Sequence, residues 1–194
     1  MKMLKLGELV EIYSGQIMSR IVVDSKAKEE GVEFRVVTPK AISQDGLIIK
    51  EELPIEILKA APDTNRITEI GDIVIKLSTP YDSATITEEF AGCVIPSFCA
   101  VIRNINGICK DYLQAFLSSK LCKEQLKSKV VGSVMTILSV GKIKDIDVPV
   151  PSLKEQEEIG KRYREVQNRI VTLKKIVELE SKRNDILFNN MVNV

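Results

Sequence analysis

The chain has 194 residues, of which 44% are hydrophobic and 28% are charged, and its formal net charge is +1. This composition is typical of one folded domain with an appendage and argues against a disordered chain. No apolar run approaches the roughly 20 residues that span a bilayer, and Gly7 and Glu8 interrupt the N-terminal apolar stretch. We therefore expect neither a membrane segment nor a secretion signal, and we expect a cytoplasmic protein.

The residue types argue against an independent enzyme. The chain contains no histidine, so the commonest general base and metal ligand at neutral pH is missing. Its four cysteines lack the C-x-x-C spacing of a structural zinc site: Cys93, Cys99, Cys109 and Cys122. The first two lie in the apolar stretch AGCVIPSFCAVI, where buried, reduced thiols are expected. Lys76 and Tyr81 have no activating partner nearby in the sequence, so we expect no catalytic residue, no metal site and no cofactor.

The charges are unevenly distributed along the chain. Residues 1–90 carry 11 Lys/Arg against 16 Asp/Glu, residues 91–152 carry 8 against 4, and residues 153–194 carry 9 against 7. The first segment is therefore net acidic and the other two are net basic. This asymmetry is weak support for a polyanionic partner, because solvated faces produce it as well.

The first half of the chain predicts short elements. Residues 6–13, LGELVEIY, have apolar side chains at helical spacing and predict one or two helical turns. Residues 33–50 contain two β-rich runs, and a proline-marked connection with a helical turn at 54–60 follows. Residues 71–78, GDIVIKLS, predict a strand, because a Gly-Asp turn precedes alternating apolar residues.

The second half predicts more strands and one good helix. Strands are predicted in GCVIPS (92–97), FCAVIRN (98–104) and GSVMTILS (132–139). Between them, residues 111–126 have apolar side chains at helical spacing, and Asp111 suits the N-cap. The chain up to the prolines therefore predicts an α+β domain with a mixed, mostly β core.

A long helix is predicted after Pro149 and Pro151, which should end the preceding segment. Ser152 and Glu155 then fit a capping box. No proline follows, so a helix from Leu153 to Asn190 would be about 57 Å long at about 1.5 Å per residue. That length exceeds the roughly 30 Å expected for the head.

Apolar residues form a seam along this helix, in the alternating steps of four and three that are typical of a coiled coil: Ile159, Tyr163, Val166, Ile170, Leu173 and Val177. At Glu180 and Asn184 the seam either weakens or shifts to another face. A hairpin that folded the helix back would need a turn, for which only Asn189-Asn190 is suitable. We therefore expect a second helix against the seam and assign residues 152–194 to dimerisation and spacing.

The order of these features resembles the DNA specificity (S) subunit of type I restriction-modification systems. The stretches LGELVEIYSGQ, GDIVIKLS, GCVIPSFCAVIR and DYLQAFLSSK look like successive parts of one target-recognition domain, residues 1–151. The exit GSVMTILSVGKIKDIDVPVPSLKEQEEI, with its proline pair and Glu155-Gln156, is the most specific part. The resemblance covers essentially the whole chain.

The resemblance implies a half-length subunit. Family members usually carry two recognition domains and two long helices that pack together, whereas this chain has one of each and no internal repeat. The missing half would come from a second copy or a sibling chain, or the chain would be a truncated product. A homodimer would bind a bipartite, palindromic site on double-stranded DNA. DNA methyltransferase subunits and, through them, a restriction (translocase/nuclease) subunit would be the partners, and those subunits would bind S-adenosylmethionine and ATP.

In this family, variable loops of the recognition domain read the bases, so we predict the DNA contacts from loop chemistry. Gln and Arg can pair with adenine and guanine, and lysine and hydroxyl groups suit phosphates and base edges. Three polar or basic loops supply the predicted DNA-binding residues: Gln16, Ser19 and Arg20; Lys76, Ser78, Thr79 and Tyr81; and Lys127, Lys129, Ser133 and Thr136.

Two classes of function stay open at this point. The first is a non-catalytic, sequence-specific DNA-binding subunit. The alternative is a coiled-coil protein-interaction module with lost or no DNA specificity. The acidic first 90 residues favour the alternative, because phosphate contacts dominate DNA affinity. An enzyme based on cysteine or lysine has the least support.

Overall fold

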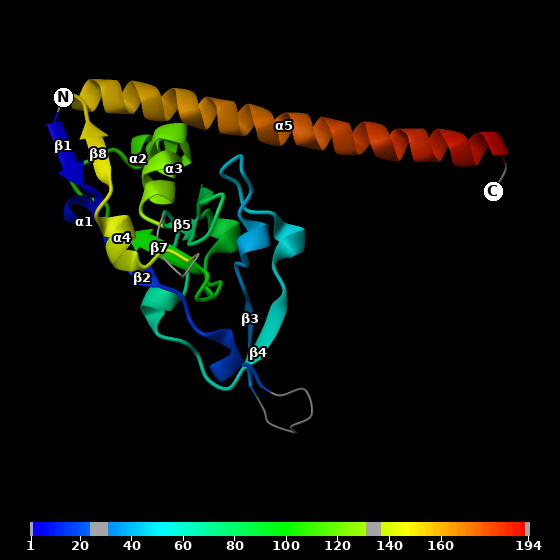
Figure 1. The fold of residues 1–194 in the computed structure, drawn as a ribbon. Coiled ribbons are helices and arrows are strands. Elements are labelled where there is room, and N and C mark those ends of the chain that lie inside the picture. The colour runs from blue at the N-terminus through cyan, green and yellow to red at the C-terminus, as the bar shows by residue number, and fades with distance from the viewer. Residues whose placement is uncertain (1, 24–30, 131–136, 193–194) are drawn as a thin grey trace.

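The computed structural model describes residues 2–23, 31–130 and 137–192. A head of strands and short helices lies beneath one 40-residue helix, α5, whose C-terminal half continues past the head (Figure 1). The α+β class and the long C-terminal helix predicted from the sequence are confirmed. The helices and strands of the described chain are β1 (Lys2–Lys5), α1 (Leu6–Leu9), β2 (Glu11–Ser14), β3 (Val32–Arg35), β4 (Ile55–Leu58), β5 (Ile73–Lys76), β6 (Ser83–Thr85), β7 (Cys99–Arg103), α2 (Lys110–Ser118), α3 (Lys120–Ser128), α4 (Val140–Lys144), β8 (Asp147–Val150) and α5 (Leu153–Val192).

A four-stranded antiparallel sheet in the order β2-β7-β5-β6 forms the centre of the head. The strand predicted in GDIVIKLS is β5, and it is buried on both faces. Ile73 and Ile75 pack into one hydrophobic cluster, which also contains apolar residues of α2, α3 and α4. Val74 packs into a second cluster, because successive strand residues point to opposite faces. The sheet therefore separates two cores.

Burial determines the state of three cysteines. Cys93, Cys99 and Cys122 are buried free thiols, as predicted for the first two. Burial raises the pKa of the Cys99 and Cys122 thiols to about 12. Both therefore stay protonated at neutral pH, which makes them unreactive.

Two-stranded sheets flank the central sheet. β1 pairs antiparallel with β8, with Lys2 opposite Val150, so the first strand holds the segment that leads into α5. The prediction that the proline pair ends the preceding segment is wrong for Pro149, which lies within β8. An edge strand tolerates proline, because its outer side needs no backbone donor. β3 pairs with β4 in the same antiparallel manner.

Two predicted helical turns are wrong, because strand pairing overrides the local pattern. The helix predicted over 6–13 is limited to α1, and residues 11–14 instead form β2, which pairs with β7. The turn predicted at 54–60 is β4, which pairs with β3. A short apolar run fits a helix or a strand equally well, and only the distant partner strand decides between them.

The strand predictions are only partly confirmed. Of the two β-rich runs in 33–50, the first forms β3 and the second contains short 3-10 turns and an isolated bridge. The stretch GCVIPS makes only isolated bridges, whereas FCAVIRN contains β7 as predicted. The strand predicted at 132–139 lies largely outside the described residues.

The helix predicted over 111–126 is divided in two. α2 begins at Lys110 with Cys109 at its N-cap, so Asp111 lies in the first turn and not at the cap. Ser119 separates α2 from α3, and its hydroxyl accepts a hydrogen bond from the Cys122 amide at 3.2 Å. A serine in this position caps the following helix.

The long helix begins with the predicted capping box. The Ser152 amide donates to Glu155 Oε2 at 2.9 Å, and the Glu155 amide donates to the Ser152 hydroxyl at 3.4 Å. The Ser152 hydroxyl also donates to Glu155 Oε2 at 2.6 Å, and this bond, together with the one from the Ser152 amide, lowers the pKa of Glu155. The helix runs without interruption to Val192, which is about 60 Å at about 1.5 Å per residue. It does not fold back as a hairpin.

The first half of α5 packs against the head, mainly on α2. Gln156 is 3% exposed and therefore fills part of this contact. The polar contacts between the helix and the head include Gln156 Oε1 with the Cys109 amide (2.8 Å), the Tyr163 and Ser118 hydroxyls (2.9 Å), Arg164 with Asp111 (2.6 Å) and Lys174 with Asp45 (2.6 Å). Contacts spaced along five helical turns fix the direction of α5 relative to the head.

This packing divides the predicted seam. Tyr163 and Ile170 are half-buried against the head. The other seam residues are 44–66% exposed: Ile159, Val166, Leu173 and Val177. From Val171 to Val192 every residue of α5 is exposed. The head therefore covers part of the seam and leaves an apolar stripe in solvent.

Gly160 lies where α5 crosses α2. An ideal Cβ at this position would lie 2.9 Å from Asp111 Cβ and 2.9 Å from the Tyr112 amide nitrogen. We expect Gly160→Val to destabilise the protein by about 1–3 kcal/mol in urea unfolding, because the two helices must move apart. Glu157→Val, at an exposed position of the same helix, controls for the helix propensity of valine. Equal losses in the two variants would contradict the close crossing.

Candidate nucleic-acid interface

Two of the three predicted DNA-contacting loops meet at one end of the central sheet. β2 continues into the loop SGQIMSR (14–20), β5 continues into KLSTPYDS (76–83), and β7 begins between them. The Gly15 amide donates to the Cys99 carbonyl at 3.1 Å, and the Leu77 amide donates to the Phe98 carbonyl at 2.9 Å. The 3-10 turn η1 (Met18–Arg20), blue in the lower part of Figure 1, lies on the side of the head away from α5.

Gly15 makes this convergence possible. An ideal Cβ at Gly15 would lie 2.1 Å from the Pro96 carbonyl oxygen and 2.6 Å from the Ile95 carbonyl oxygen. Any side chain there would push the end of β2 away from the segment that precedes β7. Gly15 is therefore a site of close backbone approach.

A hollow of about 310 Å³ lies at this sheet end, and its lining includes Gln16, Arg20, Arg66 and Ser97. The Gln16 side-chain oxygen accepts a hydrogen bond from Arg66 Nη1. The backbones of both residues also bond to Ile95. The Gln16 amide donates to the Ile95 carbonyl at 2.7 Å, and the Ile95 amide donates to the Arg66 carbonyl at 3.0 Å. Arg66 and Ser97 were not predicted, because no local pattern connects them with Gln16.

The second loop buries two of its predicted DNA contacts. Tyr81 is 1% exposed and belongs to the hydrophobic core. The Lys76 side chain is 13% exposed, and its ammonium lies 2.9 Å from the Asp82 carboxylate. In this structure both side chains hold the loop in place, because Tyr81 is buried and Lys76 is paired with Asp82. In the second loop, Thr79 is exposed and Ser78 is half-buried. In the first loop, Ser19 and Arg20 are exposed and Gln16 is half-buried.

Asp82 joins the second loop to α3. Its side chain is 3% exposed and contacts both Lys76 (2.9 Å) and Lys123 (2.7 Å). Burial by itself would raise the pKa of Asp82, but hydrogen bonds from Lys123 and Lys76 lower it below its ordinary value. The carboxylate is therefore ionised at neutral pH and holds the loop against the helix.

The third predicted loop is only partly within the described residues. Lys127 is exposed in the last turn of α3. Lys129 forms an ion pair with Asp145 at 2.6 Å, so its charge is already balanced within the chain. Ser133 and Thr136 lie outside the described residues.

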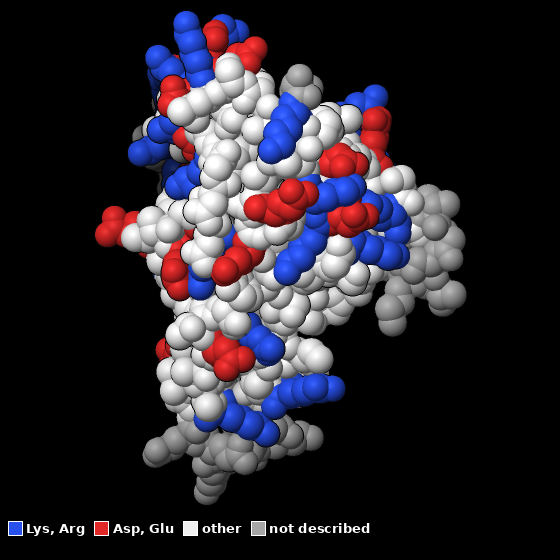
Figure 2. All heavy atoms as spheres, turned by 90° about the vertical axis from the view of Figure 1, so that its left-hand side faces the viewer, with Lys and Arg blue, Asp and Glu red and all other residues white. Residues whose placement is uncertain are grey.

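The basic middle segment of the chain does not form a uniformly basic face. Figure 2 shows the side of the head where β1 and β8 lie, and Lys and Arg side chains alternate there with Asp and Glu. Lys5 lies 3.5 Å from Asp145 and 2.8 Å from Asp147. A lysine of the acidic first segment thus pairs with two carboxylates of the basic middle segment, so charges of both signs are mixed on this face.

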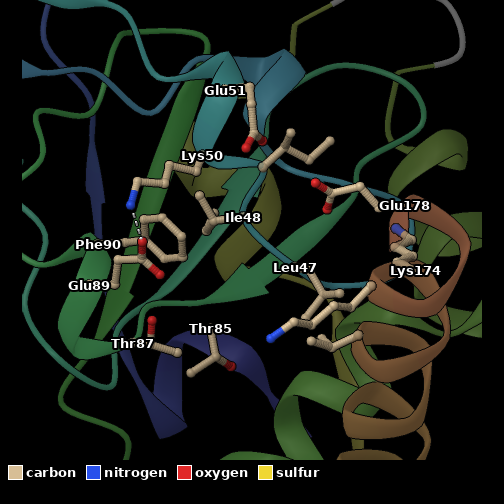
Figure 3. A pocket seen from close by; sticks show the side chains of 13 residues that line it. Leu47, Ile48, Lys50, Glu51, Thr85, Thr87, Glu89, Phe90, Lys174 and Glu178 are labelled. Carbon is tan, nitrogen blue, oxygen red and sulfur yellow. Dashed lines mark hydrogen bonds and ion pairs between the residues drawn. The ribbon is translucent and has the colours of Figure 1, made fainter. Parts of the chain in front are cut away.

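A groove of about 700 Å³ lies between α5 and the loop before β4. Figure 3 shows Lys174 and Glu178 of α5 on one side, and Phe90 beside the ion pair of Lys50 and Glu89 on the other. The apolar lining includes Leu47, Ile48 and Val171. The groove marks the place where α5 leaves the head, and we assign it no chemistry.

Beside the exposed Ile17 and Phe98, the exposed polar side chains at the sheet end include the hydroxyls of Ser19 and Thr79 and the Arg20 guanidinium. Such donors suit phosphate oxygens and base edges. Across residues 2–23, 31–130 and 137–192, no helix combines the length and apolarity needed to cross a bilayer. Within the same ranges, no three Cys, Asp or Glu side chains gather in a way that could hold a metal ion.

Comparison with known proteins gives one family match. Residues 1–181 match the family model described as the type I restriction modification DNA specificity domain. No curated protein matches the sequence significantly.

Several solved structures share the fold. One comes from a study titled "Structural basis underlying complex assembly and conformational transition of the type I R-M system". It has a TM-score of 0.60 and 19% sequence identity, and the match covers 93% of this chain and 42% of that one. The HsdS subunit from Thermoanaerobacter tengcongensis has a TM-score of 0.57, 20% identity and coverages of 90% and 39%. The type I restriction-modification S subunit from M. genitalium has a TM-score of 0.60, 18% identity and coverages of 96% and 44%. The chain thus spans less than half the length of each.

Proposed function

Because the chain belongs to the type I restriction modification DNA specificity family, we propose that it is a non-catalytic subunit that binds double-stranded DNA in a sequence-specific manner. It directs a type I methyltransferase and endonuclease to their target. The observation that carries this proposal is the convergence of polar loops at one sheet end, away from a helix with an exposed apolar stripe. Residues 1–151 recognise DNA, and residues 152–194 provide dimerisation and spacing.

The loops at the sheet end contact the duplex. Ser19 and Thr79 are exposed hydroxyls on the two loops that flank the start of β7. Lys127 adds an exposed cation on α3. This helix is joined to the second loop by the ion pair of its Lys123 with Asp82. Hydroxyls contact base edges and phosphates, and lysine contacts phosphates. The carboxylates on the face shown in Figure 2 weaken DNA binding by this chain alone, so partner subunits supply part of the affinity.

A second copy of the chain covers the exposed stripe of α5. The two helices lie antiparallel about a two-fold axis perpendicular to them, with one head toward each end. A helix of about 60 Å is longer than the roughly 34 Å of one DNA turn, so two heads carried near its opposite ends can reach separate half-sites. The target is then two half-sites with an unread gap, and it is palindromic if the two chains are identical. A sibling chain in place of the second copy gives a target without that symmetry.

Methyl transfer and DNA cleavage belong to partner subunits in the cytoplasm. This chain binds the methyltransferase and, through it, the restriction (translocase/nuclease) subunit. It needs no cofactor of its own.

The test is to co-express the chain with its genomic neighbours in a methylation-free host and to sequence the methylated DNA. We expect one bipartite motif to be modified, and the same operon without this chain should modify none. An intact complex in a host whose DNA stays unmodified would refute the proposal.

A second candidate function is a coiled-coil protein-interaction module without DNA specificity. The net acidic residues 1–90 and the mixed charges in Figure 2 favour it. Electrophoretic mobility at low salt, with and without the methyltransferase, separates the two candidates. If the complex retards the target DNA more than unrelated DNA, the DNA-specificity subunit is supported. If both DNAs have equal mobility, the protein-interaction module is supported.

A further inference from the structure

We propose that the hollow between Arg20 and Arg66 holds one phosphate group of the target DNA backbone. This inference rests on the proposed function, and it assigns Gln16 and Arg20 a different role from the base reading predicted from their residue types. Three properties of the hollow carry it: shape, charge and preorganisation.

The shape of the site matches a phosphate and not a base edge. Base edges lie within a major groove about 8.5 Å deep, so a side chain that reads them must project from the protein surface. Phosphates project outward from the duplex, so a concave surface can enclose one. The site is a hollow of about 310 Å³, and small residues such as Ser14, Gly15 and Ser97 leave its space open.

The charge of the lining is positive. Seven described residues line the hollow. Two of them are arginines, and none is an aspartate or a glutamate. Among the residues that the structure describes, Arg66 forms an ion pair with Asp63, whose carboxylate lies 3.7 Å from Arg66 Nε. The Asp63 side chain is 74% exposed, so solvent screens most of this attraction. A phosphate in the hollow would therefore meet two guanidinium groups with little competition.

The hollow is preorganised through Gln16. The hydrogen bond from Arg66 Nη1 to the Gln16 side chain occupies one terminal nitrogen and leaves other N–H groups free to donate. Gln16 and Arg66 are both tied through their backbones to Ile95. The Arg66 guanidinium is therefore held in place before DNA arrives, which lowers the entropic cost of binding. Gln16 is a positioning residue in this arrangement.

The experiment compares the complete methyltransferase complex carrying Arg20→Ala and Arg66→Ala with the wild-type complex. Binding to target and unrelated DNA is measured as a function of salt concentration. We expect the slope of log K against log salt to become less steep by about 1 on both DNAs, because one phosphate contact is lost. We expect the methylated motif to stay the same.

Lys154→Ala with Arg183→Ala removes the same charge from exposed positions of α5 and should leave the slope unchanged. Thermal unfolding checks that the variants fold. If the double variant does not fold, Arg20→Ala alone replaces it, because Arg20 lies at an exposed position. A changed motif with an unchanged slope would show base reading and overturn the inference, as would wild-type behaviour in both measurements. A wild-type complex that neither binds nor methylates DNA would overturn the proposed function as well.

Discussion

Val166→Asp combined with Leu173→Asp is expected to halve the mass of the protein in solution. Both side chains are more than half exposed on one chain and lie on the seam that we assign to a second copy of α5. Ile170 is left intact because it is half-buried against its own head. Two-fold symmetry would bury four carboxylates in an apolar interface, and each unpaired charge costs several kcal/mol. Light scattering across a range of protein concentrations measures the change.

The matched control places negative charge elsewhere on the same helix. Asn168→Asp with Lys175→Asp alters exposed positions outside the seam and should leave the dimer intact. Circular dichroism should show the same folded head in both variants, because Val166 and Leu173 are not part of its core clusters. A seam variant with the same mass as the wild type would remove the helix-to-helix contact from the proposal.

Asp82→Asn is expected to destabilise the head by about 3–5 kcal/mol. The Asp82 carboxylate is 3% exposed and neutralises both Lys76 and Lys123. Asparagine has nearly the same shape but no charge, so it leaves two lysines unpaired, and the Lys76 side chain is only 13% exposed. Urea unfolding followed by circular dichroism measures the loss.

Asp145→Asn is the matched control, because Asp145 also lies between two lysines but at the surface. Its side chain is 61% exposed, and it pairs with Lys5 and Lys129. Water screens surface ion pairs, so they contribute little to stability and this variant should be close to the wild type. Similar losses in the two variants would mean that burial does not determine the strength of the Asp82 cluster.

The stability contributed by Asp82 should depend on pH. Although burial opposes it, the hydrogen bonds from Lys123 and Lys76 hold the pKa of folded Asp82 below its ordinary value of 3.8. A carboxyl with a depressed pKa stabilises the fold fully above its unfolded pKa, and this contribution is lost as the pH falls through the folded pKa. The difference between wild type and Asp82→Asn should therefore be constant above about pH 5 and narrow as the pH falls below 3.8. A constant difference down to acid pH would contradict the assignment.

The candidate interface could be predicted only in part. The sequence shows that polar and basic loops follow the apolar strands. The sheet brings the loops after β2 and β5 together, because β7 lies between these two strands. Exposure could not be predicted: Tyr81 looks like a surface aromatic in a polar loop, yet its side chain is 1% exposed. The partner of Gln16 could not be predicted either, because Arg66 lies 50 residues away along the chain.

Features that depend on neighbours along the chain can be inferred from the amino-acid sequence alone. The start of α5 follows from Ser152 and Glu155, its length from an unbroken helical pattern, and β5 from alternating apolar residues. Contacts between distant parts of the chain determine which seam residues face the head and whether residues 11–14 form a helix or a strand. They also determine which cations stay free for a ligand. Burial and ion pairing join residues that are distant along the chain, so no local pattern contains them, whereas a helix is built from contacts three and four residues apart.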